Sequence, residues 1–403
     1  MIEHNDGDGI LARVVLRNYR SIAACDVRPA PLSILVGPNG AGKSNFLDSL
    51  RFVADALRFS LEHALQSRGG IAEVRKRSAS SPRHAGIRID LRLGEALVSY
   101  AFEIAAKRKG AYAIKREACQ LRPSILEPIH SYVVREGQVV RSSFPSLPSV
   151  SDRLYLVAAS HLPELRPVYD ALSRMTFYNF NVDAIRAPRP ATPEGILFRD
   201  GANLAEIFSG LDPASREEIV SYVAAIVPAI SDVDTHLVDR RQTLRFWQNA
   251  PGSDRRWKFP ASAMSDGTLR VLATLVAMRQ SGMIGWGAPS VVGLEEPETA
   301  LHPAAAEALL EAMRGSSRSV QILATSHGAD LLDNFTIPQD AILPVVTENG
   351  NTRIGPLDAA ARSAIDARSF TAGELLRMDQ LQPDPHWAKI EEVNLWGGIA
   401  GTV

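Results

Sequence analysis

The fold is decided by one stretch of the sequence, Leu32-Ser33-Ile34-Leu35-Val36-Gly37-Pro38-Asn39-Gly40-Ala41-Gly42-Lys43-Ser44. Its first five residues form an apolar run that predicts a strand, and apolar residues at helical spacing after Ser44 predict a helix. The residues between them match the phosphate-loop pattern G-x-x-x-x-G-K-S/T in full. A chance glycine-rich turn is the competing interpretation, and the strand–loop–helix context disfavours it. The stretch therefore predicts a nucleotide site on an α/β core.

The chemistry of this loop assigns roles to two side chains. Glycines let backbone N–H groups approach phosphate oxygens, and the start of the following helix adds positive potential. The ammonium group of Lys43 is expected to reach the β- and γ-phosphates, and the hydroxyl of Ser44 to bind Mg²⁺. A nucleotide and Mg²⁺ are therefore the predicted ligands.

The composition limits the partners and the location. The chain has 403 residues and a formal net charge of −1, so any nucleic-acid contact must use local basic patches. The two cysteines, Cys25 and Cys119, lie far apart and have no partner at metal-ligand spacing, which favours a reducing cytosol. The acidic N-terminus does not resemble a signal peptide, and no apolar run reaches the length of a membrane span. We expect a cytoplasmic protein without membrane contact.

Hydrophobic periodicity divides the chain into four parts. Residues 8–110 predict a strand-rich lobe that includes the phosphate loop. Residues 111–260 are less regular, with Pro-bearing loops and helical stretches, and predict a mainly helical insertion. Residues 261–345 alternate helix and strand, as in a parallel sheet covered by helices, and residues 346–403 form a C-terminal tail. Sustained heptads are absent from the sequence, so a long coiled-coil arm is not expected.

Paired carboxylates follow an apolar strand in the third part. The predicted strand 290–294 ends in Glu295-Glu296-Pro297-Glu298. Carboxylates at the carboxyl end of a parallel strand face the nucleotide crevice. One carboxylate can bind Mg²⁺, and the next can polarise the attacking water. An acidic helix N-cap is the alternative interpretation and is plausible for Glu298.

Two further motifs flank this acidic strand. Ser265-Asp266-Gly267-Thr268 opens a predicted helix and forms a second anion-binding helix start, although a plain capped helix would have the same residues. Since one nucleotide cannot lie on two helix starts of separate lobes, the simplest solution is a head-to-tail dimer. His327 follows the predicted strand 319–324 and could sense the γ-phosphate or hold the attacking water; the alternative is a structural histidine.

The order of these motifs resembles that of ABC-type AAA ATPases in the branch that contains the RecF, SMC and OLD families. Asn18-Tyr19-Arg20-Ser21 is similar to the opening motif of RecF-like proteins, and Ser265-Asp266-Gly267-Thr268 to their signature. Glu295-Glu296-Pro297-Glu298 with Leu301-His302-Pro303 resembles the form typical of OLD-like ATPases. The resemblance covers about residues 10–100 and 260–335.

The resemblance implies an α/β fold, the ABC-type P-loop NTPase head, with a strand-rich N-terminal lobe, a parallel-sheet lobe and a largely helical insertion. It implies that Glu295 and Ser44 hold Mg²⁺, that Glu296 is the catalytic base, and that His327 and Lys43 take part in hydrolysis. In a homodimer, Ser265 and Gly267 would act on the nucleotide held by the other subunit. The residues implied to bind ATP within one subunit are Asn39, Gly40, Ala41, Gly42, Lys43, Ser44 and Asn45.

The sequence departs from these families in three respects, the first being the absence of a zinc hook or long coiled coil. A secure Q-loop glutamine is not found, since Gln66 is the only glutamine between Ser44 and Leu93 and belongs to a predicted helix end. About seventy residues follow His327, too few for the Toprim nuclease domain of OLD proteins. We therefore expect the nuclease or other effector to be a separate protein, of the Toprim-like or HNH kind.

Three short basic runs are candidates for DNA contact, and solvated surface charge is an equal alternative for each of them. These runs are 75–77, 107–109 and 255–258. The leading hypothesis is an ATP-driven dimer that senses DNA or a foreign component and controls a separate effector in bacterial anti-phage defence. The alternatives are a RecF-like DNA repair ATPase and a structural scaffold that ATP locks.

Overall fold

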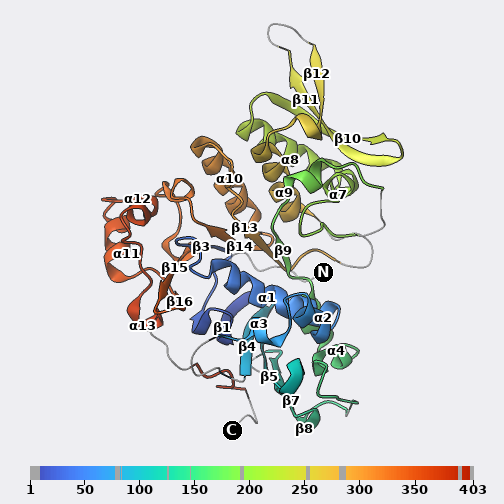
Figure 1. Cartoon of the computed structure of the whole chain (residues 1–403), viewed down its shortest axis with the longest axis vertical. Helices are drawn as coiled ribbons and strands as arrows, with labels where there is room; N and C mark the ends of the chain where they lie inside the picture. Colours follow the sequence, from blue (N-terminus) through green and yellow to red (C-terminus); the bar gives the residue numbers. More distant parts are fainter. Residues whose placement is uncertain are drawn as a thin grey trace.

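The computed structural model describes residues 10–77, 82, 84–124, 127–145, 147–190, 195–250, 255–280, 287–388 and 393–399. These residues form two large sheets with one helix packed between them, and a third, smaller sheet (Figure 1). This mixed α/β architecture confirms the predicted fold class.

The central sheet brings together strands from distant parts of the sequence. Its order is β16-β15-β3-β14-β13-β9, and all its pairings are parallel except that of β15 with β16. Strand β3, which precedes the phosphate loop, lies between β14 and β15, so the beginning and the end of the chain build one sheet (Figure 1). The strands are β3 (Leu32–Val36), β9 (Thr176–Tyr178), β13 (Val291–Glu295), β14 (Gln321–Ser326), β15 (Ile342–Glu348) and β16 (Asn351–Ile354).

The second large sheet is antiparallel and has the order β2-β1-β4-β5-β6-β7-β8. The first four of these strands lie within residues 8–110, for which a strand-rich lobe was predicted. The strands are β1 (Leu11–Tyr19), β2 (Ile22–Val27), β4 (His84–Leu93), β5 (Ala96–Ala106), β6 (Tyr112–Arg122), β7 (His130–Arg135) and β8 (Gln138–Ser142).

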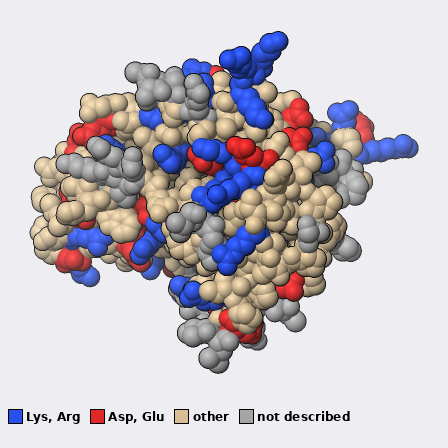
Figure 2. Space-filling view, turned by 90° about the horizontal axis from the view of Figure 1, so that it is seen from below, with Lys and Arg blue, Asp and Glu red and all other residues tan. Residues whose placement is uncertain are grey.

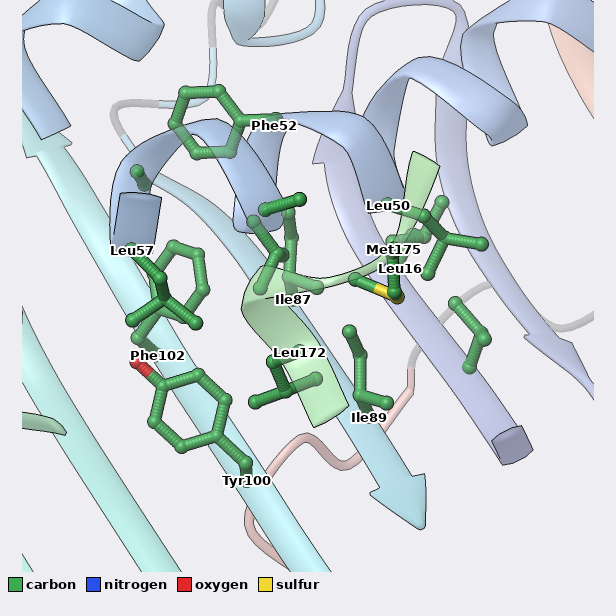
Figure 3. Packing of buried hydrophobic residues seen from close by; sticks show 14 of the residues in the cluster. Leu16, Leu50, Phe52, Leu57, Ile87, Ile89, Tyr100, Phe102, Leu172 and Met175 are labelled. Atoms are coloured by element: carbon green, nitrogen blue, oxygen red, sulfur yellow. The ribbon is translucent and has the colours of Figure 1, made fainter. Parts of the chain in front are cut away.

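Helix α1 (Lys43–Arg58) joins the two sheets through its buried face. Leu50, Phe52 and Leu57 pack among residues of the antiparallel sheet such as Ile87 and Phe102 (Figure 3). The Phe52 and Phe102 ring centroids lie 6.3 Å apart, within the usual range of aromatic pairs. The helix that begins at the phosphate loop is therefore fixed by a large apolar core.

The prediction that residues 111–260 form a mainly helical insertion is wrong. Strands β6–β8 extend the antiparallel sheet, β9 is the edge of the central sheet, and a three-stranded sheet is built from β10 (Ile230–Val238), β11 (Arg241–Asn249) and β12 (Arg256–Pro260). Polar residues hid the strand pattern: β6 has Glu117 at a fully buried position, where an apolar residue is the norm. The helices of this part are α4 (Tyr155–Ala159), α5 (Arg166–Ser173), α6 (Val182–Arg186), α7 (Leu204–Gly210) and α8 (Pro213–Ile226).

Glu117 has an unusual environment for a carboxylate. It accepts hydrogen bonds from the hydroxyls of Tyr100 and Tyr132, at 3.2 and 2.9 Å, and from the backbone N–H groups of Tyr155 and Leu156. Burial nevertheless raises the pKa of Glu117 to about 7, because the four donors offset only part of the desolvation. This carboxylate ties the antiparallel sheet to the start of α4.

The remaining helices are distributed over both large sheets. Helix α9 (Asp266–Arg279) is almost entirely buried, and α10 (Pro303–Ser316) begins with Pro303 after the cap His302. The other helices are α2 (Leu61–Gln66), α3 (Ile71–Val74), α11 (Ala359–Asp366), α12 (Ala372–Arg377), α13 (Pro385–Ala388) and the 3₁₀ turns Arg108–Gly110, Ala261–Ala263, Asp330–Leu332 and Gln339–Ala341.

The three basic runs named above do not form one continuous basic surface. Lys76 is buried, and its ammonium group lies near the carbonyl oxygens of Ser21 and Gly350, which is a structural position. Lys258 lies over the Trp247 ring, 4.8 Å from its centroid. Figure 2 shows Lys and Arg side chains interspersed with Asp and Glu on the face seen from below Figure 1. Among the described helices, none has both the length and the apolar character needed to cross a bilayer.

Candidate nucleotide-binding site

Four parallel strands end at the same edge of the central sheet. The register pairs Val36 of β3 with Ser326 of β14, Thr325 of β14 with Glu295 of β13, and Leu294 of β13 with Tyr178 of β9. The phosphate loop, His327, the paired carboxylates and Asn179 all follow these ends in the sequence. Since carboxyl ends of parallel strands form the ligand crevice of open α/β sheets, this edge is the candidate site.

The shape of the phosphate loop requires glycine at two positions. Gly42 has φ 105°, and a Cβ atom there would lie 2.1 Å from Oγ1 of Thr352. A Cβ atom on Gly37 would lie 2.0 Å from the carbonyl oxygen of Val345. Thr352 also donates a 2.8 Å hydrogen bond to the carbonyl oxygen of Ala41. The hairpin β15–β16 therefore packs directly against the loop and fixes its shape.

Lys43 is buried inside this loop. Its ammonium group donates to the carbonyl oxygens of Gly37 at 2.7 Å and Pro38 at 3.0 Å. Burial lowers the pKa of Lys43, and the nearby carboxylates of Glu296 and Glu298 partly oppose that shift. The predicted lysine and the acidic strand end therefore lie within electrostatic range of each other.

The other predicted loop residues lie around this lysine. Asn39, Gly40 and Ser44 are exposed at the surface, whereas Ala41 and Gly42 are buried. Asn45 donates a 2.6 Å hydrogen bond from Nδ2 to Oγ of Ser21, which also lies 2.7 Å from Oγ1 of Thr352. The Asn18–Ser21 turn, singled out by its resemblance to RecF-like proteins, is thus connected to the phosphate loop by side-chain hydrogen bonds.

The paired carboxylates have different surroundings. Glu295, at the end of β13, accepts a 2.8 Å hydrogen bond from the guanidinium of Arg199. Glu296 has φ 47°, a strained conformation for a residue with a side chain, and its N–H group lies 3.1 and 3.2 Å from the carbonyl and hydroxyl oxygens of Thr325. Nδ1 of His327 lies 3.1 Å from Oε1 of Glu296. The structure therefore pairs the predicted base with the predicted histidine.

Glu298 is a third carboxylate next to this pair. It is buried, and the hydroxyl of Ser326 donates to its Oε1 atom, whereas its Oε2 atom has no hydrogen-bond partner among the described residues. Burial raises the pKa of Glu298, and the Ser326 hydrogen bond offsets only part of this rise. The N-cap of the following helix α10 is His302, so Glu298 is not the cap of that helix.

The predicted signature lies at the start of α9. Ser265 is exposed and caps the helix by accepting a 3.2 Å hydrogen bond from the N–H of Thr268. Gly267 is buried, and a Cβ atom there would lie 2.5 Å from the carbonyl oxygen of Ala300. No hydrogen bond or ion pair among the described residues joins Ser265 or Gly267 to residues 37–45. Within one subunit, the phosphate loop, the paired carboxylates and His327 lie at the same sheet edge. The signature residue Ser265 instead bonds within its own helix, to Thr268.

Three residues of this edge were not predicted from the sequence. Thr325 holds the backbone of Glu296, Asn179 follows β9, and Arg199 lies in the segment before α7. Strand β9 has only three residues, too few for a periodic signal, and Arg199 lies in a segment without periodicity. Only the pairing of distant segments reveals these positions.

The donor atoms present fit Mg²⁺. This ion prefers hard oxygen ligands and takes one or two from the protein, with phosphate oxygens and water as the rest. Ser44 offers an exposed hydroxyl at the start of α1, and Glu295 offers a carboxylate at the same sheet edge. The ion would lower the charge of the bound phosphates and polarise them for attack.

Comparison with known proteins agrees with this geometry. The sequence matches a family model described as "AAA domain, putative AbiEii toxin, Type IV TA system" over residues 32–186 and 236–333, more than half of the chain. The chain belongs to this AAA family. The AAA match includes the phosphate loop, the signature, the paired carboxylates and His327. No curated protein sequence matches the chain.

Solved structures give the same fold at low sequence identity. The crystal structure of an Smc head bound to the C-terminal winged-helix domain of ScpA has 13% identity and a TM-score of 0.53, covering 87% of this chain and 99% of that one. An Smc head domain with an extended coiled coil, bound to the C-terminal domain of ScpA derived from Pyrococcus furiosus, has 11% identity, a TM-score of 0.53 and coverage of 89% and 99%. The AAA chain therefore has the fold of ABC-type ATPase heads.

Proposed function

We propose that this AAA protein binds and hydrolyses ATP with Mg²⁺ at the edge formed by β3, β14 and β13. The observation that supports this most directly is the 3.1 Å contact between His327 and Glu296, at a site whose carboxylates act electrostatically on Lys43. A buried lysine with a nearby carboxylate–histidine pair meets the requirements for phosphoryl transfer to water.

The roles follow from this geometry. Lys43 neutralises charge on the γ-phosphate, and Glu296 accepts a proton from the attacking water. His327 keeps the Glu296 carboxylate oriented toward that water. Bound Mg²⁺, held by Ser44 and Glu295, would stabilise charge on the phosphate oxygens. The exposed loop residues Asn39 and Gly40 would contact the nucleotide with their backbone N–H groups.

The active form in this proposal is a homodimer with nucleotides at the interface. Ser265 is exposed at the start of a 14-residue helix, and among the described residues its hydroxyl bonds only to Thr268 of the same subunit. A helix start of this kind binds anions. Placed head to tail, Ser265 and Gly267 of one subunit would complete the phosphate site of the other.

In the cell we propose a role in bacterial anti-phage defence. The dimer would sense DNA or a foreign component and control a separately encoded effector, such as a Toprim-like or HNH nuclease. The description of the AAA family names a toxin of a type IV TA system, and this description supports a role in such a system. The free, buried thiols of Cys25 and Cys119 are compatible with the cytosol as its location.

A RecF-like role in DNA repair is the second candidate. It is supported by the Asn18–Ser21 turn, which bonds to the phosphate loop through Ser21 and Asn45. Preferential binding of the purified protein to gapped DNA, without an effector, would favour this role.

The test is phosphate release by the purified protein with ATP and Mg²⁺, measured over a range of protein concentrations. We expect the rate per subunit to rise with concentration, because a monomer has only half of each site. Glu296→Gln should abolish turnover while ATP binding persists. If wild type and Glu296→Gln release phosphate at the same negligible rate, ATP serves only to lock a scaffold. A rate per subunit independent of concentration would contradict the composite site.

A further inference from the structure

The carboxylate assigned to Mg²⁺ already has a cationic partner from its own chain. The guanidinium of Arg199 donates a 2.8 Å hydrogen bond from Nη2 to Oε1 of Glu295. The side chain of Glu295 is 18% exposed and that of Arg199 is 46% exposed, so solvent reaches the pair from the Arg199 side. Neither the sequence motifs nor the family match assigns a role to this arginine.

The backbone around Arg199 is held firmly in place. Its carbonyl oxygen accepts a 3.0 Å hydrogen bond from the N–H of Asn179, and Asp200 accepts one from the N–H of Asn181. The buried Asn203 accepts a hydrogen bond from the N–H of Phe198 and donates one to Ile196. These bonds fix the segment before α7 against the end of β9, next to β13 in the sheet. The position of Arg199 relative to Glu295 is therefore a built feature of the fold.

Other arginines lie in the surroundings of Arg199. Arg199 also lines a cavity of about 570 Å³ whose wall includes Arg51 and Arg58 of α1. Burial lowers the pKa of Arg51, and the charge of Arg199 lowers it further. Since Arg51 is a like charge in the surroundings of Arg199, the carboxylate of Glu295 supplies the compensating negative charge.

We propose that Arg199 competes with Mg²⁺ for Glu295 and thereby sets the Mg²⁺ concentration at which the nucleotide site loads. A guanidinium and a divalent cation both need the same carboxylate oxygen, and each repels the other. The inference rests on the proposed function, since it takes Glu295 as the magnesium ligand. Arg199 is a positioning residue in this proposal, because it acts through Glu295.

The experiment measures binding rather than turnover. A fluorescent ATP analogue is added at fixed concentration to the full-length protein, and fluorescence anisotropy is followed as Mg²⁺ is titrated in. Arg199→Gln should lower the Mg²⁺ concentration at half-maximal binding by about fivefold, the effect expected from removing one partly exposed ion pair. Arg199→Lys keeps a positive charge and should stay within about twofold of wild type. Binding of the analogue in EDTA should be the same for all three proteins.

Two controls identify the cause. In a Glu295→Gln background, Arg199→Gln should have no further effect on the Mg²⁺ midpoint, because the competition requires the carboxylate. Arg166→Gln, which removes another partly exposed arginine that pairs with Asp170, should leave the midpoint unchanged. If the wild type binds the analogue but the Mg²⁺ midpoint of Arg199→Gln is unchanged or raised, the inference about Arg199 is wrong. The proposed ATP site would not be affected by that result. If the wild type binds no nucleotide with or without Mg²⁺, the proposed function fails as well.

Discussion

Nδ1 of His327 lies 3.1 Å from Oε1 of Glu296, and the two residues follow neighbouring parallel strands. Glu296 is in turn held in a left-handed conformation by two hydrogen bonds from its N–H group to Thr325. Strain of this kind persists where the surrounding structure over-determines it, and it is concentrated at functional sites.

His327→Ala should lower the rate of ATP hydrolysis by about tenfold to a hundredfold, because Glu296 loses the partner that orients it. Glu296→Gln should cost at least about a hundredfold, since it removes the base itself. Single-turnover phosphate release measures both effects, and equilibrium binding of ATP should change little in either variant. A His327→Ala enzyme with wild-type turnover would reduce this contact to a structural one.

Thr352→Val should weaken ATP binding by about threefold to tenfold. The substitution keeps the side-chain shape but removes the hydrogen bonds to Ala41 and Ser21, each worth about 1 kcal/mol. Isothermal titration calorimetry would measure the affinity. Thr336→Val is the matched control, because it also removes a hydrogen bond, with Arg314, on the surface. Equal affinities for Thr352→Val and wild type would show that the hairpin does not shape the loop.

Mixing two inactive variants should restore activity if each site is shared between subunits. Lys43→Ala inactivates one half of a site and Ser265→Glu inactivates the other half. In an equal mixture with random pairing, about a quarter of all sites would therefore be intact. Phosphate release is the measurement. Lys43→Ala mixed with Glu296→Gln is the control, since both residues belong to the same half and no intact site can form. If phosphate release is restored in both mixtures, or in neither of them, the head-to-tail dimer with shared sites is contradicted.

Glu117 should make stability depend on pH. Its folded-state pKa of about 7 lies above the ordinary 4.5, so the folded state binds the proton more tightly than the unfolded chain does. The resulting stabilisation is complete below pH 4.5 and is lost as the pH rises through 7, a change of about 3 kcal/mol in the free energy of unfolding.

Denaturant unfolding of wild type and Glu117→Gln between pH 5 and pH 8 would test this prediction. The stability advantage of wild type over Glu117→Gln should shrink as the pH rises, because the amide cannot ionise. Glu164→Gln, at an exposed position, controls for general charge effects. A difference that stays constant across this range would mean that Glu117 is ionised throughout.

The fold class was predictable from the sequence because the phosphate loop and the acidic strand end both mark parallel strands. The order in which Glu296 and His327 follow consecutive apolar runs also predicts that they lie at one sheet edge. Their catalytic roles, and the action of Ser265 and Gly267 in trans, stay predictions, as does the division of the chain at residues 110, 260 and 345.

The middle of the chain was not predictable for physical reasons. Strand β6 contains charged side chains that are satisfied only by tertiary partners, as Glu117 is by Tyr100 and Tyr132, so its pattern does not look like that of a strand. Strand β9 is recognisable only through its pairing with β13, more than a hundred residues away. Arg199 has no local signal because its partner Glu295 comes from that same distant strand.

The contact between Thr352 and the phosphate loop has a consequence for synthesis on the ribosome. The loop is translated early, but β3 needs β14 and β15 as neighbours, and Ala41 needs a hydroxyl located 311 positions downstream. Contacts this distant in sequence form slowly. The nascent chain should therefore be unable to retain nucleotide until the β15–β16 hairpin has emerged, and a truncated product that ends before the hairpin should be inactive although it contains every recognisable motif.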